Sequence, residues 1–232
     1  MVAVNGARRT FRDSEEFERQ TLSEKAYRRL EEMIVTLRLQ PGSVVTEGEL
    51  GTLLGIGRTP LREAIQRLAV QRLVTTLPRH GLVVNEINLM EHLDVLETRR
   101  VLDRLIASGA ARRATPDERT MLREYAARMG TAAKSGDLTE FMRLDQEFDQ
   151  LLADASRNSA ASNAIAPLHI HCRRFWYLHQ HQGDLAKAGR LHGELIKAVA
   201  DGDEQRAVDA SDVLVQYLED FTRHALDHYL NR

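Results

Sequence analysis

The chain has 232 residues, of which 43% are hydrophobic and 28% are charged, and its formal net charge at pH 7 is −2. This composition is ordinary for a folded soluble protein and excludes a disordered chain. No apolar run approaches the roughly 18 residues of a membrane span, and the N-terminus has no apolar signal segment, so we expect a cytoplasmic protein. Cys172 is the only cysteine. An internal disulfide and a zinc finger built on several thiols are therefore excluded.

Glycine, proline and arginine are concentrated in the N-terminal third. Residues 41–81 contain six of the 14 glycines and three of the five prolines, which is typical of short elements joined by tight turns. Residues 55–82 contain five arginines and one acidic residue, so positive charge is local although the whole chain is nearly neutral. From residue 88 the sequence is rich in helix formers. We expect an N-terminal arm over residues 1–20, a small domain over 21–87, and an all-helical domain over 88–232.

The small domain is predicted to begin with three short helices. Apolar residues recur at helical spacing over residues 24–37. Thr46 and Glu49 form a capping box that starts a second helix, and Gly55 suits the left-handed position at its end. A third helix follows over residues 58–71. Two helices joined by a three-residue turn are typical of a helix-turn-helix.

A β-hairpin is predicted directly after these helices. Strand-forming residues occupy 74–77 and 82–84, and the turn residues between them include Pro78 and Gly81. A hairpin in this place is a wing, so the domain is expected to be a winged helix-turn-helix.

Arg58 and Arg62 lie in the N-terminal part of the third helix. This is the part of a recognition helix that contacts base edges and phosphates. Arginine reads guanine through two hydrogen bonds. The alternative is a solvated helix face without a ligand. The turn, the capped helix, the wing and the local positive charge together favour double-stranded DNA as the partner.

These motifs, in order, resemble the winged helix of the GntR family of bacterial transcription regulators. The resemblance implies that Arg58 contacts a base, that Thr59 and Arg62 hold phosphates, and that His80 and Gly81 enter the minor groove. Gly57 and Gly48 depart from the family pattern, which implies an altered or relaxed sequence preference. The resemblance rests on Pro41-Gly42, Glu47-Gly48-Glu49-Leu50, the run from Leu54 to Ala64, and His80-Gly81.

Six helices joined by short loops are predicted after residue 88, which indicates an antiparallel bundle and a mainly α protein. Thr115 and Pro116 mark the start of the second helix, and Gly136 and Gly202 mark the ends of the second and fifth. The predicted bounds are Leu89–Arg113, 115–136, Leu138–Ala155, Asn158–Gln182, Asp184–Asp201 and Asp203–Asn231.

Three polar residues are placed near the bundle core by spacing. Asp145 and Asp149 are four residues apart and share a helix face, and His192 is in register with core positions. The spacing alone is compatible with a metal site, and equally with two solvent-exposed aspartates and a histidine packed in the core.

The helical domain also resembles the effector domain of FadR-type members of the GntR family, the FCD domain, in its six-helix version. The resemblance rests on residues 97–103, on Leu144-Asp145 with Phe148, and on Arg190-Leu191-His192. Metal-binding members use one Asp and three His. In this sequence Asp145 and His192 match ligands, Asp149 replaces one histidine, and Leu214 replaces another.

Two kinds of effector site are therefore open. In the first, Asp145, Asp149 and His192 hold a divalent ion (Zn²⁺, Mn²⁺ or Mg²⁺), and water completes the shell. In the second, a metal-free pocket holds an anionic effector through Arg99 and His192. Both place effector binding at Arg99, Asp145, Asp149 and His192.

A second group of potential ligands lies on the predicted fourth helix. His169 and His171 are two residues apart and point to different helix faces, as do His179 and His181. We expect structural or surface roles for these residues and for Cys172.

The combined pattern predicts a homodimeric, ligand-responsive transcription regulator that binds a palindromic operator. The resemblance implies a small organic acid as effector. We expect no enzyme activity. The alternative is a metal-dependent hydrolase built on Asp145, Asp149 and His192.

Overall fold

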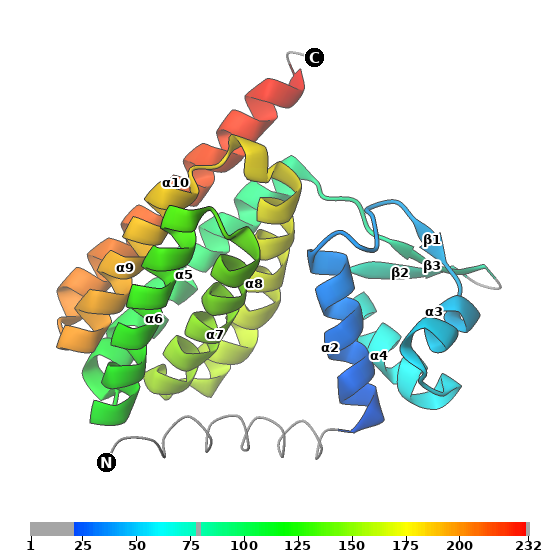
Figure 1. The fold of residues 1–232 in the computed structure, drawn as a ribbon, viewed down its shortest axis with the longest axis horizontal. Coiled ribbons are helices and arrows are strands. Elements are labelled where there is room, and N and C mark those ends of the chain that lie inside the picture. The colour runs from blue at the N-terminus through cyan, green and yellow to red at the C-terminus, as the bar shows by residue number, and fades with distance from the viewer. Residues whose placement is uncertain (1–20, 78–79, 231–232) are drawn as a thin grey trace. The chain divides into compact units, whose positions relative to one another are not determined.

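The computed structural model describes residues 21–77 and 80–230, and it divides into two compact units between Glu86 and Ile87 (Figure 1). A winged helix-turn-helix comes first and an all-helical unit follows, which confirms the predicted fold class. The expected arm over residues 1–20 lies outside the described residues. Within the described part of the chain, no helix is long and apolar enough to cross a membrane.

The described part of the first unit contains three helices: α2 (Leu22–Val35), α3 (Glu47–Leu54) and α4 (Arg58–Val70). Thr46 and Glu49 form the predicted capping box of α3, and Gly55 ends that helix in the left-handed region, with φ of 64°. Apolar side chains from all three helices make the core, because each helix presents one apolar stripe inward. They include Leu30, Ile34, Leu50, Leu61, Ile65 and Leu68.

The wing is a three-stranded antiparallel sheet in the order β1-β3-β2. Its strands are β1 (Val44–Val45), β2 (Val74–Leu77) and β3 (Gly81–Val84). The hairpin of β2 and β3 was predicted. Strand β1 was not, because two residues are too few for an alternating pattern. Gly81 has φ of 95°, and a Cβ atom there would collide with the carbonyl oxygen of Val45, so β3 approaches β1 as closely as only glycine permits.

Six helices form the second unit, as predicted, and α5 packs against four of them, α7, α8, α9 and α10 (Figure 1). The predicted fourth helix ends three residues early, at His179, and continues as a short 3₁₀ segment, η1 (Gln180–Gln182). The helices are α5 (Leu89–Arg113), α6 (Pro116–Ser135), α7 (Leu138–Ser156), α8 (Ser159–His179), α9 (Leu185–Asp201) and α10 (Glu204–Leu230).

The bundle core is apolar around its centre, where Phe148 and Phe175 are each 1% exposed. Sequence signals fix the ends of the helices that surround it. Thr115 and Glu118 form a capping box at the start of α6, and α6 and α9 end at left-handed glycines, as predicted. The helices are thereby held in a defined length and register around the polar site described below.

The connection between the two units is short and anchored at both sides. The side chain of Asn85 belongs to the first unit, where its Oδ1 accepts a hydrogen bond from Thr75 Oγ1 at 2.7 Å. Ile87 packs against the bundle core. Asn88 caps α5 and accepts from the backbone N–H of Met90 at 2.9 Å.

Candidate functional site

Helix α4 exposes the residues that were predicted to contact DNA. Arg58, Thr59 and Arg62 are exposed, while Leu61 and Ala64 between and beside them are buried. The Nε atom of Arg62 lies 2.8 Å from Glu47 Oε2, in an ion pair that is largely open to solvent. Arg58 makes no ion pair with any residue that the structure describes.

Arg67 has a different role from the one its charge suggested. Its Nη1 lies 2.6 Å from Glu24 Oε2, and its guanidinium lies 3.9 Å above the ring of Tyr27. It therefore ties α4 to α2 and does not add to a free basic surface. At the wing tip, His80 is exposed and Gly81 begins β3, whereas Pro78 and Arg79 lie outside the described residues.

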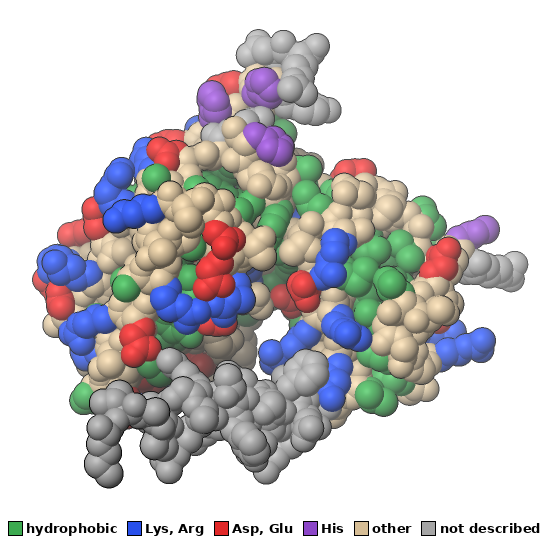
Figure 2. Space-filling model, viewed as in Figure 1, with side chains coloured by type: hydrophobic (Ala, Val, Ile, Leu, Met, Phe, Trp, Pro, Cys, Tyr) green, Lys and Arg blue, Asp and Glu red, His purple; other side chains and the backbone are tan. Residues whose placement is uncertain are grey.

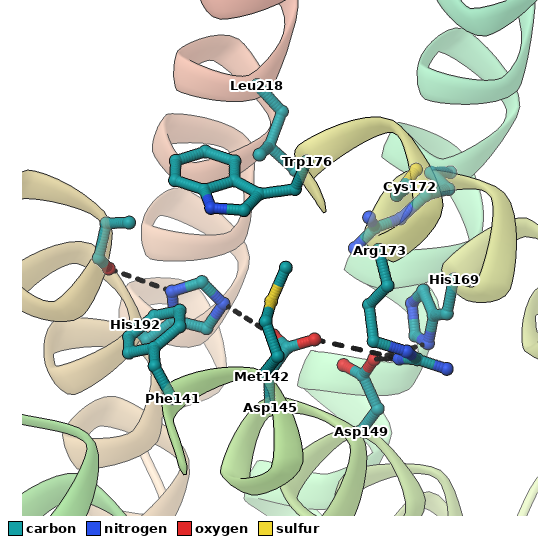
Figure 3. A pocket seen from close by; sticks show the side chains of 12 residues that line it. Phe141, Met142, Asp145, Asp149, His169, Cys172, Arg173, Trp176, His192 and Leu218 are labelled. Carbon is teal, nitrogen blue, oxygen red and sulfur yellow. Dashed lines mark hydrogen bonds and ion pairs between the residues drawn. The ribbon is translucent and has the colours of Figure 1, made fainter. Parts of the chain in front are cut away.

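The second site is a cavity of about 40 Å³ inside the helical unit, walled by side chains of α5, α7, α8, α9 and α10 (Figure 3). All four predicted effector residues, Arg99, Asp145, Asp149 and His192, line it. The structure thus brings together residues that are almost 100 positions apart in sequence. The apolar part of the wall is formed by Phe141, Met142, Trp176, Ala188 and Leu218.

Charged side chains around this cavity form one chain of contacts across four helices, which we call the ionic network. It begins on α5, where Arg99 Nε lies 3.1 Å from Asp103 Oδ2. Asp103 Oδ1 lies 3.2 Å from Nε2 of His169 on α8, and Nδ1 of the same ring lies 2.9 Å from Oδ2 of Asp149 on α7. The members of the ionic network are Arg99, Asp103, Asp145, Asp149, His169, Arg173 and His192.

The second half of the ionic network joins α7, α8 and α9 (Figure 3). Nη1 of Arg173 lies 2.8 Å from Asp149 Oδ2 and 3.6 Å from Asp145 Oδ2. The other oxygen of Asp145 lies 3.0 Å from His192 Nε2, and His192 Nδ1 lies 2.8 Å from the carbonyl oxygen of Ala188. The network thus ends on the backbone of α9.

The partners of the two histidines determine their charge. A neutral imidazole has one N–H, and both ionised carboxylates and carbonyl oxygens only accept hydrogen bonds. His169 faces a carboxylate at each ring nitrogen, and His192 faces a carboxylate and a carbonyl oxygen. Each ring can satisfy both of its partners only as the doubly protonated imidazolium.

Electrostatics supports the same assignment. Burial opposes the charged form of His169, but the carboxylate of Asp149 and the hydrogen bonds to both neighbouring carboxylates raise its pKa above the usual value. Burial also opposes the charged form of His192, and the hydrogen bond and charge of Asp145 raise its pKa. In return, and against burial, His192 holds the pKa of Asp145 well below its usual range.

The ionic network therefore contains four cationic groups and three carboxylates, which leaves one positive charge in excess. Its side chains are only 8–16% exposed. The charged side chains on the outer surface of the same unit are in contact with solvent instead, and there Lys and Arg are interspersed with Asp and Glu (Figure 2).

The expected metal-ligand set does not form. Within residues 21–77 and 80–230, no three His, Cys, Asp or Glu side chains are arranged to hold a metal ion. Asp145 and His192 are hydrogen-bonded to each other, and the Arg173 guanidinium lies against both Asp145 and Asp149. A divalent ion beside these carboxylates would face an adjacent fixed cation, so the residues as arranged do not fit Zn²⁺, Mn²⁺ or Mg²⁺.

His169 and Arg173 are residues of this cavity that the sequence analysis did not include among the effector residues. Of the structural or surface role expected for His169, the surface alternative is excluded, because the side chain is buried between Asp103 and Asp149. The sequence did contain a signal for His169 and Arg173. They are four residues apart on α8, as are Asp145 and Asp149 on α7, so each pair occupies one helix face. Charged pairs at this spacing on neighbouring core helices indicate a shared polar site.

Comparison with known proteins now identifies the family. Residues 22–84 match the gntR family of bacterial regulatory proteins, and residues 94–217 match the FCD domain. The chain belongs to the GntR family of DNA-binding transcription regulators and carries an FCD domain. The sequence resemblance is thereby confirmed for both units.

Relatives of this GntR-family chain are regulators by name. A transcriptional regulator from an unstable DNA locus of Streptomyces ambofaciens is 30% identical over 178 residues, which cover 76% of this chain and 75% of that protein. The Nta operon transcriptional regulator of Aminobacter aminovorans is 28% identical over 69% of this chain and 76% of its own length. The hydrolase alternative receives no support from these relatives.

Solved structures show the same fold. E. coli McbR/YncC superposes with a TM-score of 0.79 at 18% identity, covering 89% of this chain and 99% of that one. A GntR regulator from Rhodococcus sp. RHA1 superposes with a TM-score of 0.67 at 20% identity, covering 88% and 97%.

Proposed function

We propose that this GntR-family regulator is a homodimer whose affinity for its DNA operator changes when a small monocarboxylate binds in the FCD cavity. The proposal rests mainly on the one excess positive charge of the buried ionic network. It assigns no enzyme activity to the protein, and it places the protein in the cytoplasm, with the DNA.

The choice of a monocarboxylate follows from charge and size. Each cation of the ionic network contacts a carboxylate, but the cations outnumber the carboxylates by one, and one bound anion would balance the charge of the whole network. Arginine and imidazolium groups both donate to carboxylates in strong, charge-assisted hydrogen bonds. A cavity of about 40 Å³ has room for about three water-sized groups, which fits a small carboxylate. The apolar side chains of Met142 and Leu218 suit a short hydrocarbon portion.

The DNA part of the proposal assigns contacts to α4 and the wing. Arg58 would read a base edge, and Thr59 and Arg62 would hold phosphates. His80 and Gly81 would reach the minor groove. Exposure of Arg58, Thr59 and Arg62 at the start of α4 supports these roles, because recognition helices meet DNA at this end.

The dimer part is supported by apolar side chains on the outer surface of the bundle. Val101 and Leu105 are 68% and 51% exposed on one face of α5, and Val213 on α10 is 51% exposed. The ion pair between Arg104 and Asp212, at 3.7 Å, brings these stretches of α5 and α10 together. A two-fold dimer through this surface would require a palindromic operator.

The test begins with selection of duplexes from a random pool by the full-length protein. Fluorescence anisotropy then measures affinity for the selected duplex with and without acetate, propionate, lactate and pyruvate. We expect a two-fold symmetric sequence and a change in DNA affinity with at least one carboxylate. Failure to enrich a sequence, or identical DNA affinity with every carboxylate, would contradict the proposal.

A pair of neighbouring arginines provides matched variants for this test. Arg99 lines the cavity, whereas Arg100 pairs with Glu219 outside it, at 2.8 Å. We expect Arg99→Gln to lose the carboxylate response and Arg100→Gln to keep it. Equal responses in the two variants would count against the cavity as the effector site.

A further inference from the structure

Glu47, the first residue of α3, holds one of the two arginines in the N-terminal part of α4. Its Oε2 lies 2.8 Å from Nε of Arg62, and the side chains of Glu47 and Arg62 are 37% and 64% exposed. Arg58 lies four residues before Arg62 on the same face of α4, and no described residue forms an ion pair with it. An ion pair this open to solvent adds little to folding stability. Its effect is therefore to be sought in how Arg62 meets DNA.

The local chain makes Glu47 the acidic partner of Arg62. The capping box fixes the first turn of α3, and Oε2 of Glu49 accepts hydrogen bonds there from the backbone N–H and the hydroxyl of Thr46, each at 2.8 Å. Glu49 is thus committed to the cap. Glu63 follows Arg62 directly in α4, and consecutive residues of a helix do not face each other. Glu47 lies in the fixed first turn, so its position against α4 is fixed as well.

The ion pair leaves the end of the Arg62 guanidinium available to DNA. A guanidinium carries five N–H donors in a rigid planar fork, and Glu47 accepts the one on Nε. The other four are on Nη1 and Nη2, and two of them suffice for a bidentate contact with one phosphate. Arg62 therefore approaches DNA with its direction already set.

We propose that Glu47 is a positioning residue for DNA recognition. It confines Arg62 to one direction and repels phosphates that approach from other directions, and the protein thereby distinguishes its operator from random DNA. The role of Glu47 rests on the proposed contact between Arg62 and a phosphate, and it adds the residue that sets the direction of that contact.

Charge and side-chain order give the reason. An unrestrained arginine can follow a phosphate on any sequence, and such contacts supply non-specific binding. The carboxylate of Glu47 opposes this, because it balances the local charge and holds the side chain. On the operator, Arg62 is already ordered when it meets its phosphate, which lowers the cost of binding and offsets the repulsion. Phosphate contacts also set the register in which bases are read. Glu47 thus weakens binding to random DNA more than binding to the operator.

Fluorescence anisotropy at one fixed salt concentration tests the proposal on two duplexes. One is the duplex that the wild-type protein enriches from a random pool, and the other is a scrambled duplex of the same composition. We expect Glu47→Ala to bind the scrambled duplex at least about three-fold more tightly, which corresponds to the repulsion of one unit charge across about 7 Å of water. Its affinity for the enriched duplex should change less, so the ratio of the two affinities falls.

Glu47→Gln separates position from charge. It removes the negative charge but keeps an oxygen that can accept from Arg62 Nε, so it should keep more of the ratio than Glu47→Ala. Both substitutions change a partly exposed side chain, and we expect both variants to fold as the wild type does. An equal ratio in the wild type and Glu47→Ala would overturn the proposal.

Two further variants serve as controls. Arg62→Ala should weaken binding to both duplexes, and adding Glu47→Ala to it should leave the ratio unchanged, because the arginine that Glu47 positions is gone. Glu24→Ala is the matched control, since Glu24 pairs at 2.6 Å with Arg67 in the last turn of α4, and it should keep the wild-type ratio.

The controls also distinguish failure of the role of Glu47 from failure of the proposed DNA contact. If Arg62→Ala binds both duplexes as the wild type does, the phosphate contact is refuted and the role of Glu47 with it. If Arg62→Ala weakens binding while Glu47→Ala keeps the wild-type ratio, only the role of Glu47 is refuted. A fall in the ratio that is equally large in Glu24→Ala would refute it too, because any lost carboxylate of the unit would then have the same effect.

Discussion

His92 gives a quantitative prediction for the stability of the helical unit. Its ring lies near the start of α5, is 6% exposed, and stacks on Phe175 with ring centroids 3.9 Å apart and planes 5° from parallel. Burial lowers the pKa of His92 to about 3, and the positive charge of Arg99 acts in the same direction. His92 is therefore neutral in the folded protein near neutral pH.

The sign of the effect follows from proton linkage. In the unfolded chain His92 has a pKa of about 6.5, so below this pH the unfolded state binds a proton that the folded state excludes. As the pH falls, the free energy of unfolding decreases by about 1.4 kcal/mol per pH unit. Between pH 6.5 and about pH 5 the decrease is about 2 kcal/mol. His92→Phe keeps an aromatic ring against Phe175 and removes this loss.

The two network histidines act in the opposite sense, because their pKa values are raised in the folded protein. Their contribution is complete below the unfolded pKa and is lost as pH rises through the folded values. They do not produce a loss between pH 6.5 and about pH 5. The decrease in the free energy of unfolding between pH 6.5 and about pH 5 can thus be assigned to His92 by comparing the wild type with His92→Phe.

Urea unfolding followed by tryptophan fluorescence provides the assay. Trp176 is the only tryptophan in the chain and lies in the helical unit, so the signal reports on that unit alone. A packing change in His92→Phe shifts the free energy of unfolding equally at both pH values, so it does not affect the difference between them. His224→Phe is the control, because His224 is exposed. The reasoning is refuted if wild type and His92→Phe lose the same free energy of unfolding between pH 6.5 and about pH 5.

Four further predictions concern packing and DNA contact. Gly81→Ala forces a Cβ against the carbonyl oxygen of Val45, so we expect a lower melting temperature and weaker DNA binding, measured by calorimetry and anisotropy. Phe148→Ala leaves a cavity in the bundle core, where Phe148 is 1% exposed, and should cost about 3–5 kcal/mol in urea unfolding. Arg62→Ala should reduce the slope of log affinity against log salt concentration by about 1, as for one lost phosphate contact. Gly57→Ser meets no atom within 4 Å and adds a cap hydroxyl to α4, so we expect a few tenths of a kcal/mol of stabilisation and tighter DNA binding, measured by urea unfolding and anisotropy. Weaker binding by Gly57→Ser, or an unchanged salt slope for Arg62→Ala, would contradict the assigned contacts.

The winged helix could be predicted closely because its signals are local. The capping box of Thr46 and Glu49 and the left-handed Gly55 determine where α3 begins and ends, whatever packs around it. Strand β1 carries no such signal. Val44 and Val45 become a strand only because β3 lies beside them, with Val44 paired to Val83.

The cavity was predictable only in part, for a related reason. Asp145 and His192 matched a known motif, but their partners depend on how α8 is rotated about its axis inside the bundle. This rotation places His169 and Arg173 in the cavity. Their spacing of four residues shows that they share a helix face, but it does not show that this face meets Asp145 and Asp149. Arg173 in turn places a guanidinium beside Asp145 and Asp149, the carboxylates of the first kind of effector site that the sequence left open.

The short connection between the two units limits how they can move. Asn85 is fixed to the winged helix and Ile87 to the bundle, which leaves only the backbone around Glu86 and its two neighbours to absorb a reorientation. Each residue contributes two soft dihedral angles. A change in orientation between the two units must therefore be absorbed by the dihedral angles of these three residues. Glycines inserted after Glu86 would lengthen the connection and widen the range of its dihedral angles, so the orientation of the recognition helix would depend less on α5, the helix that carries Arg99.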